Sequence, residues 1–209
     1  MIFKDRFEAG RKISQQLKNV KRPFILAIPR GGVVLGAAIA KKLKCPLSII
    51  VARKLGAPDN PELAIGAVTA DGDLFLDQDL IDRIGVRPEY IMSEQEAQMK
   101  EAERREKAYR QGLQRPNLKG KAAILVDDGL ATGATMEAAI RSVKREGASK
   151  VIIAVPVSPR GTVEHFKGIV DDIIVLSVPS SFLAIGQFYS DFPQVSDEEV
   201  ISLLKKSNK

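Results

Sequence analysis

The chain has 209 residues, of which 44% are hydrophobic and 28% charged, as is ordinary for a globular domain with a sizeable core. One cysteine excludes an internal disulfide and a cysteine-rich metal site. No apolar run is long enough to cross a membrane, so we expect a cytoplasmic protein with no membrane partner. The net charge of +6 suits an anionic ligand, whereas only 5% aromatic residues and no basic-aromatic motif argue against a nucleic-acid partner.

The first strand and the turn after it form a candidate anion site. An amphipathic helix is predicted at residues 5–19, followed by a buried strand at residues 24–28. This strand leads into Pro29-Arg30-Gly31-Gly32 and a second helix. The glycine pair allows unusual backbone angles, and Arg30 adds a planar cation beside a helix N-terminus, which would hold pyrophosphate well. Taken alone, this turn could equally be a plain surface turn.

Two adjacent cations, Arg53 and Lys54, follow the next predicted strand at residues 47–51. They could form an exposed basic edge, or they could bind phosphate. Further along, residues 64–69 and 74–76 are predicted to pair as a hairpin around Asp71-Gly72.

Residues 88–114 are predicted to form one long helix. Its acidic and basic residues alternate at helical spacing, which is typical of a solvated face. A weak apolar stripe would pack this helix against the body of the protein or against another subunit, so a homodimer is one expectation.

The most informative stretch runs from Ala122 to Met136. Its first five residues, Ala122-Ala123-Ile124-Leu125-Val126, are all apolar, as in a strand buried on both faces of a parallel sheet. Two carboxylates follow, Asp127 and Asp128, which we call the acid pair. After them come small and hydroxyl residues, Ala131-Thr132-Gly133-Ala134-Thr135, which we call the small loop, and then a helix.

Each part of this order has a chemical use. Small residues let backbone N–H groups approach an anion, and the first turn of the next helix adds unpaired N–H groups and a positive dipole end. Ionised carboxylates only accept hydrogen bonds, so the acid pair suits a sugar diol with two O–H donors. The stretch therefore predicts a ribose 5-phosphate pocket.

Further strands are predicted at residues 151–155 and 173–176, with a helix near residues 162–167 between them. Alternating strands and helices indicate an α/β fold with a Rossmann-like parallel sheet. Ligands then bind at the carboxyl ends of the strands, where Arg30, Lys54 and the acid pair all fall.

The tail from residue 179 onward contains several aromatic residues among Gly, Ser and Asp. Phe188 and Tyr189 are candidates for stacking on a nucleobase, and packing in the core is the equal alternative.

The stretch from Val126 to Met136 resembles the phosphoribosyl-pyrophosphate (PRPP) signature of type I phosphoribosyltransferases, in the Ala-Thr-Gly form of adenine phosphoribosyltransferase. The resemblance covers about residues 22–178 in motif order. It implies a single domain over residues 1–209, with a core at about 22–178 and a small hood or lid made by the N-terminal helix and residues 179–209.

The resemblance also assigns roles. It implies that Arg30, Gly31 and Gly32 bind the pyrophosphate of PRPP, in a turn that can contain a cis peptide bond, for which Arg30-Gly31 is the candidate. It further implies that Arg53 and Lys54 lead into a mobile catalytic loop at residues 56–66, and that the small loop binds the 5-phosphate. The acid pair would hold the ribose hydroxyls and would contact Mg²⁺ indirectly, through PRPP or water.

The implied activity is transfer of the phosphoribosyl group from PRPP to a nitrogenous base, with Mg²⁺ as cofactor and pyrophosphate as product. Two alternatives remain: a PRPP-sensing regulator that binds nucleic acid, and a hydrolase of PRPP or of a nucleotide. Two departures from the family pattern bear on the base. Ala131 stands where hypoxanthine-type enzymes have an acid, which counts against that type, and Gly129 replaces the usual apolar residue.

Overall fold

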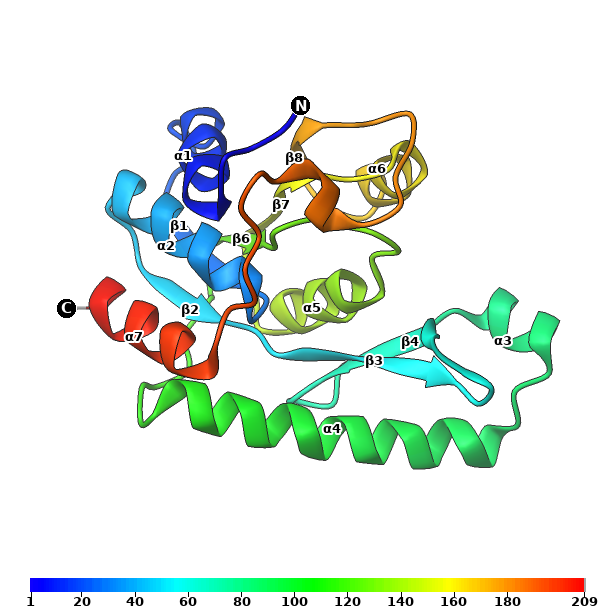
Figure 1. The fold of residues 1–209 in the computed structure, drawn as a ribbon. Coiled ribbons are helices and arrows are strands. Elements are labelled where there is room, and N and C mark those ends of the chain that lie inside the picture. Colours follow the sequence, from blue (N-terminus) through cyan, green and yellow to red (C-terminus); the bar gives the residue numbers. More distant parts are fainter. Residues whose placement is uncertain (209) are drawn as a thin grey trace.

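The computed structural model describes residues 1–208 (Figure 1). Helices and strands alternate along most of the chain, as the sequence predicts. In chain order they are α1 (Arg6–Gln16), β1 (Pro23–Ala27), α2 (Gly31–Leu43), β2 (Leu47–Ile49), β3 (Ala52–Ala57), β4 (Asn60–Thr69), β5 (Leu74–Leu76), α3 (Gln78–Ile84), α4 (Pro88–Arg110), β6 (Ala122–Val126), α5 (Ala134–Arg145), β7 (Lys150–Val157), α6 (Arg160–Lys167), β8 (Asp172–Ser177), η1 (Ile185–Phe188) and α7 (Asp197–Ser207).

The main sheet has the order β2-β1-β6-β7-β8, and all of its strand pairs are parallel. All five residues of β6 are buried. The predicted α/β fold with a central parallel sheet is therefore confirmed.

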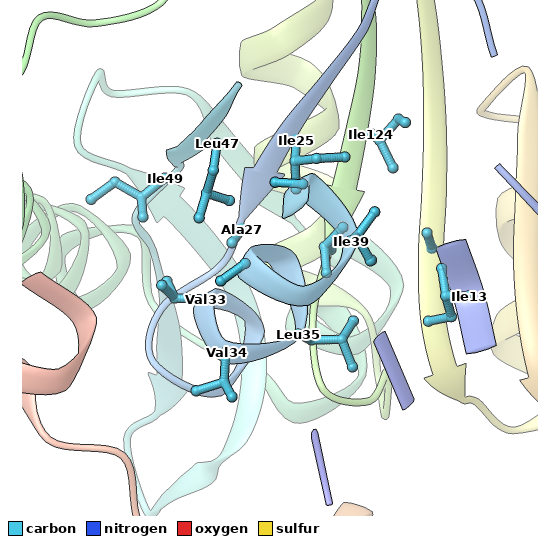
Figure 2. Close-up of a cluster of buried hydrophobic side chains, with 14 of the residues drawn as sticks. Ile13, Ile25, Ala27, Val33, Val34, Leu35, Ile39, Leu47, Ile49 and Ile124 are labelled. Carbon is cyan, nitrogen blue, oxygen red and sulfur yellow. The ribbon is translucent and has the colours of Figure 1, made fainter. Parts of the chain in front are cut away.

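Two cores cover the two faces of this sheet. On one face, Ile124 of β6 lies in a cluster with Ile25 of β1, Ile39 of α2 and Ile13 of α1 (Figure 2). On the other face, side chains of α5 and α6 pack against β6 through Leu125. Successive side chains of a strand point to opposite faces, so an unbroken apolar run such as β6 needs both layers of helices.

A second sheet, with the order β3-β4-β5, is antiparallel and lies between α4 and α5 (Figure 1). The predicted pairing of residues 64–69 with 74–76 is confirmed. The segment at residues 56–66, predicted to be the mobile catalytic loop, belongs mostly to the hairpin of β3 and β4. Leu55 and Ile65 are fully buried there against α3, so burial of apolar side chains orders the hairpin.

Helix α4 ends at Arg110, four residues before the predicted end at residue 114. It joins the hairpin to the main sheet. The Tyr90 hydroxyl donates a hydrogen bond to the carbonyl of Gly56 (3.0 Å), and Arg110 donates to the Ser48 hydroxyl in β2 (2.9 Å). Within residues 1–208, none of the helices has the length and apolar composition needed to cross a membrane.

Helix α1 packs closely on α2 at Gly10. A methyl group at this position would lie 2.7 Å from the carbonyl oxygen of Leu35 and 2.9 Å from the Cβ of Ala38. The glycine therefore lets the two helices meet and sets the position of the first turn of α1.

Replacing Gly10 by Ala is expected to lower the free energy of unfolding by about 1–3 kcal/mol, because overpacking outweighs the better helix propensity of Ala. Gly161→Ala is the matched control, since the space around Gly161 in α6 is open and Ala there should stabilise by about 0.4–1 kcal/mol. Urea unfolding of both variants measures the difference. Equal stabilisation by both would contradict the close packing of α1 on α2.

Candidate functional site

The carboxyl ends of β1 and β6 bring two sequence motifs together. The strands are parallel neighbours, with Ala27 paired with Val126, so the turn at residues 29–32 lies beside the acid pair. A Cβ on Gly32 would lie 2.7 Å from the carbonyl oxygen of Val126 and 3.1 Å from the Cα of Asp127, and one on Gly31 would overlap the carboxylate of Asp128. Only glycine fits at both positions without a shift of the acid pair.

This turn contains one cis peptide bond, between Pro29 and Arg30. The prediction of a cis bond at Arg30-Gly31 is therefore wrong by one peptide. Arg30 lies just before the N-terminus of α2, and its Nη1 is 3.8 Å from Oδ1 of Asp197 at the start of α7.

Asp128 forms an ion pair that the sequence analysis did not predict. Its Oδ2 accepts a hydrogen bond from Nε of Arg6 at 2.7 Å, and both side chains are nearly buried. Arg6 also donates to the carbonyl of Pro193 (2.9 Å), and its guanidinium lies 3.7 Å from the centre of the Phe192 ring. The two partners of this pair are 122 residues apart, so no local spacing could have indicated it.

Asp127 has a different environment. Its Oδ1 accepts a hydrogen bond from the backbone N–H of Asp128 (2.8 Å). Burial, and then the neighbouring charge of Asp128, raise the pKa of Asp127 well above its ordinary value. The two carboxylates therefore differ, since one is paired with a cation and the other is desolvated beside a like charge.

The small loop reverses the direction of the chain between the end of β6 and the first turn of α5. Gly133 has φ of +89°, and a Cβ there would lie 2.6 Å from the Phe166 ring, so this position requires glycine. The hydroxyl of Thr162 donates to the carbonyl of Ala131 (2.7 Å), which fixes the loop, while Ala131 and Thr132 are exposed. In the described chain, 1–208, α5 has no side-chain cap, so the N–H groups of its first turn can bind an anion.

The departure from the family pattern at Gly129 has a structural explanation. A Cβ at Gly129 would lie 2.6 Å from Cγ2 of Ile185 in η1. Ile185 thus occupies the space that an apolar residue at position 129 would need, and this contact brings the hood against the site.

A cavity of about 520 Å³ adjoins this edge of the sheet. Its lining includes Pro29, Thr135 and three cationic side chains, Arg53, Lys54 and Arg105. Burial and the nearby charge of Arg105 lower the pKa of Arg53. Nε of Arg53 donates to the amide oxygen of Gln98 (3.0 Å), whereas Lys54 lies 3.5 Å from the exposed carboxylate of Glu62. Glu62 and Glu94 line the same cavity, so its three cations outnumber its carboxylates by one. A net positive lining of this kind favours an anionic ligand.

Arg105 is a further residue that the sequence analysis missed. It lines the cavity from α4, where Tyr109 lies one turn further along. Arg105 also belongs to the charged pairs of α4, and its Nε donates to Glu101 at 2.7 Å. The sequence predicted a solvated charged face and a weak packing stripe on this helix, and the structure shows that Arg105 of the charged set also lines the cavity.

Phe188 and Tyr189 do not present a ring face for a nucleobase. Each is only 7% exposed, and both belong to the core cluster around α2. The Tyr189 ring stacks on Phe192, and its hydroxyl donates to the backbone carbonyl of Asp128 (2.6 Å). Of the two alternatives, core packing is therefore the one that the structure matches.

Within residues 1–208, no group of three or more His, Cys, Asp or Glu side chains is placed to bind a metal ion on its own. The single histidine, His165, lies 3.3 Å from Glu137 and takes no part in the edge that carries the acid pair.

A parallel sheet with an acid pair, a glycine turn and a helix N-terminus at one edge is an arrangement that α/β proteins commonly use to bind phosphorylated ligands. The model of the phosphoribosyl transferase domain matches residues 4–192. The chain therefore belongs to the phosphoribosyltransferase family, and its fold is that of the type I enzymes.

The curated relatives include a Mycobacterium tuberculosis protein named "Putative phosphoribosyl transferase Rv0571c", which is 40% identical over 210 residues. The match covers 100% of this chain and 47% of that protein, so the chain spans about half the length of the curated relatives it matches.

Many solved structures are similar to this chain, among them the following two. The protein TT1426 from Thermus thermophilus has a TM-score of 0.85 and 38% identity, with 99% of each chain covered. A purine phosphoribosyltransferase from Pyrococcus horikoshii has a TM-score of 0.52 and 17% identity, with 91% of this chain and 92% of that chain covered. The second similarity shows the fold alone.

The different environments of the acid pair predict opposite effects of the same substitution. Asp127→Asn should raise the free energy of unfolding at pH 7, because it removes a carboxylate that is partly desolvated beside the like charge of Asp128. Asp128→Asn should lower it by about 3 kcal/mol, because it leaves Arg6 buried without its counter-ion.

The gain from Asp127→Asn should also depend on pH. A raised pKa in the folded state costs stability as the pH rises through that pKa, so the gain should vanish below about pH 4, where Asp127 is protonated in both states. Urea unfolding of the wild type and both variants between about pH 3.5 and 8 measures these effects. Changes of the same sign at pH 7 would contradict the unequal environments.

Proposed function

We propose that this chain transfers the 5-phosphoribosyl group of PRPP to a nitrogenous base and releases pyrophosphate. The observation that carries the proposal is the meeting of the acid pair, the glycine turn and the small loop at one edge of the sheet. PRPP has matching parts: a sugar diol, a pyrophosphate and a 5-phosphate.

The small loop is proposed to bind the 5-phosphate. Backbone N–H groups at the start of α5 and the hydroxyls of Thr132 and Thr135 would donate to its oxygens, and the positive end of the helix dipole favours its charge. Gly133 and Ala134 keep side chains out of this space. The acid pair would then accept hydrogen bonds from the ribose hydroxyls.

The pyrophosphate is proposed to lie between the glycine turn and the cationic cavity. Gly31 and Gly32 allow its oxygens to approach the N-terminus of α2, and Arg30, Arg53 and Lys54 supply positive charge. The acceptor nitrogen forms a bond to C1 of the ribose while the C1–O bond breaks, and the electron pair of the C1–O bond leaves with pyrophosphate. The proton of the acceptor N–H passes to water or to the released pyrophosphate. Positioned cations accelerate this step because they stabilise the charge that develops on the leaving group.

Mg²⁺ is the proposed cofactor. Magnesium commonly binds one or two carboxylates together with substrate phosphates, and an acid pair without a third protein ligand fits this mode. Asp127 and Asp128 would contact the ion through water or through PRPP. The bound ion would neutralise charge on the pyrophosphate.

The test of the proposal is pyrophosphate release from PRPP with Mg²⁺ over a panel of purine and pyrimidine bases. Release should depend on one base or a few related bases. Lys54→Ala should lower kcat/KM about 10-fold or more, since it removes a charge-assisted contact to the leaving group. Lys41→Ala, an exposed change in the last turn of α2, should leave the activity unaltered.

Two results would contradict the proposed activity, and a third would contradict the role of Lys54. Release without any base would indicate a hydrolase. PRPP binding without turnover would indicate a regulator. Equal rates for Lys54→Ala and Lys41→Ala would remove Lys54 from the leaving-group site.

A further inference from the structure

Arg6 lies inside the site although it belongs to none of the motifs found in the sequence. It is the first residue of α1 and only 7% exposed. Its guanidinium contacts three separate parts of the chain: the acid pair through Asp128, the tail through Pro193 and Phe192, and the glycine turn, where a Cβ on Gly31 would lie 3.0 Å from Nε. These contacts on three sides fix the orientation of the Arg6 guanidinium.

The hydrogen bonds of the acid pair leave one oxygen of each carboxylate free of protein donors. Oδ1 of Asp127 accepts from the backbone N–H of Asp128, and Oδ2 of Asp128 accepts from Arg6. Within residues 1–208, the further side-chain interaction of these two residues is with each other, and it contributes to the raised pKa of Asp127. Apart from this mutual contact, each carboxylate keeps one oxygen that no backbone N–H or cationic donor occupies, and a ribose diol has two O–H donors to place on them.

Asp128 is held at both its side chain and its backbone. Arg6 fixes one carboxylate oxygen, and the hydroxyl of Tyr189 donates to the backbone carbonyl of the same residue (2.6 Å). With one oxygen fixed by Arg6, the other points in a defined direction. Without Arg6, the carboxylate can rotate about its Cβ–Cγ bond.

The charge of Arg6 also matters for a polyanionic ligand. Two carboxylates beside PRPP would repel it, and a cation buried against Asp128 offsets one of them. Arg6 donates its hydrogen bond to Oδ2 of Asp128. A ribose hydroxyl can therefore bind Oδ1 of Asp128 without displacing the Arg6 guanidinium.

We propose that Arg6 is a positioning residue for the ribose of PRPP: it orients Asp128 on one ribose hydroxyl and so makes α1 and the tail part of the PRPP site. This inference rests on the proposed function, since it assumes that the acid pair binds ribose. It assigns to the hood a role in recognising the donor substrate.

The test is calorimetric titration with PRPP and with ribose 5-phosphate. Arg6→Gln should weaken the binding of both ligands by about 10-fold or more, as expected when a charge-assisted contact loses its alignment. Arg6→Lys, which keeps one charged donor, should recover part of the loss. Arg11→Gln is the matched control, because it removes the same charge from an exposed position on α1 and should not change binding.

A double-mutant cycle separates positioning from a purely structural role. In an Asp128→Asn background, adding Arg6→Gln should change the dissociation constant less than about 3-fold, because its effect passes through Asp128. A purely structural role would instead lower the melting temperature and the fraction of competent protein, seen as reduced stoichiometry, with an unchanged dissociation constant. Arg6→Lys provides the same comparison if Arg6→Gln does not fold.

The results that would contradict the role of Arg6 differ from those that would contradict the proposed function. Unchanged binding in Arg6→Gln and Arg6→Lys, or equal losses with and without Asp128, would overturn the role of Arg6 and leave the proposed function intact. Tighter binding would show that Arg6 competes with the ligand, and would overturn it as well. Failure of the wild type to bind either ligand would overturn the proposed function and this inference together.

Discussion

The close approach of the glycine turn to the acid pair is the constraint on which the site depends. β1 and β6 are adjacent parallel strands, so the residues that follow them must share one edge of the sheet. Gly31 and Gly32 leave no room for a Cβ, because Asp128 and Asp127 occupy that space. Every other part of the site is arranged around this contact: the start of α2, the small loop before α5 and the first turn of α1.

Charge is distributed unevenly around that contact. On one side, the acid pair holds two carboxylates, of which Arg6 neutralises one and burial keeps the other poorly solvated. On the other side, Arg53, Lys54 and Arg105 gather at one cavity. Such arrangements cost stability, because like charges are held together and partly out of water. Proteins tolerate them where a ligand uses them, which is consistent with a sugar diol on one side and a pyrophosphate on the other.

The sequence predicts those parts of the site whose residues are neighbours in the chain. The apolar run at residues 122–126, the acid pair and the small loop follow from local patterns, and they lie where the motif requires. The rule that parallel strands share one carboxyl edge predicted that the glycine turn and the acid pair would meet there. Other contacts between distant segments were not predictable, because no local periodicity encodes them. Arg6 is one residue in an ordinary amphipathic helix until the fold brings it to Asp128. Likewise, Tyr189 could be a stacking ring or a core ring, and only the packing of the tail decides.

A crystal structure of the protein with PRPP and Mg²⁺ would test the account most directly. We expect the 5-phosphate in the small loop and the ribose hydroxyls on Asp127 and Asp128, one on each carboxylate, with Arg6 still paired to Asp128. The pyrophosphate should lie against Gly31 and Gly32 and reach toward Arg53 and Lys54. Density for PRPP at another edge of the sheet, or a ribose that contacts neither carboxylate, would contradict the account.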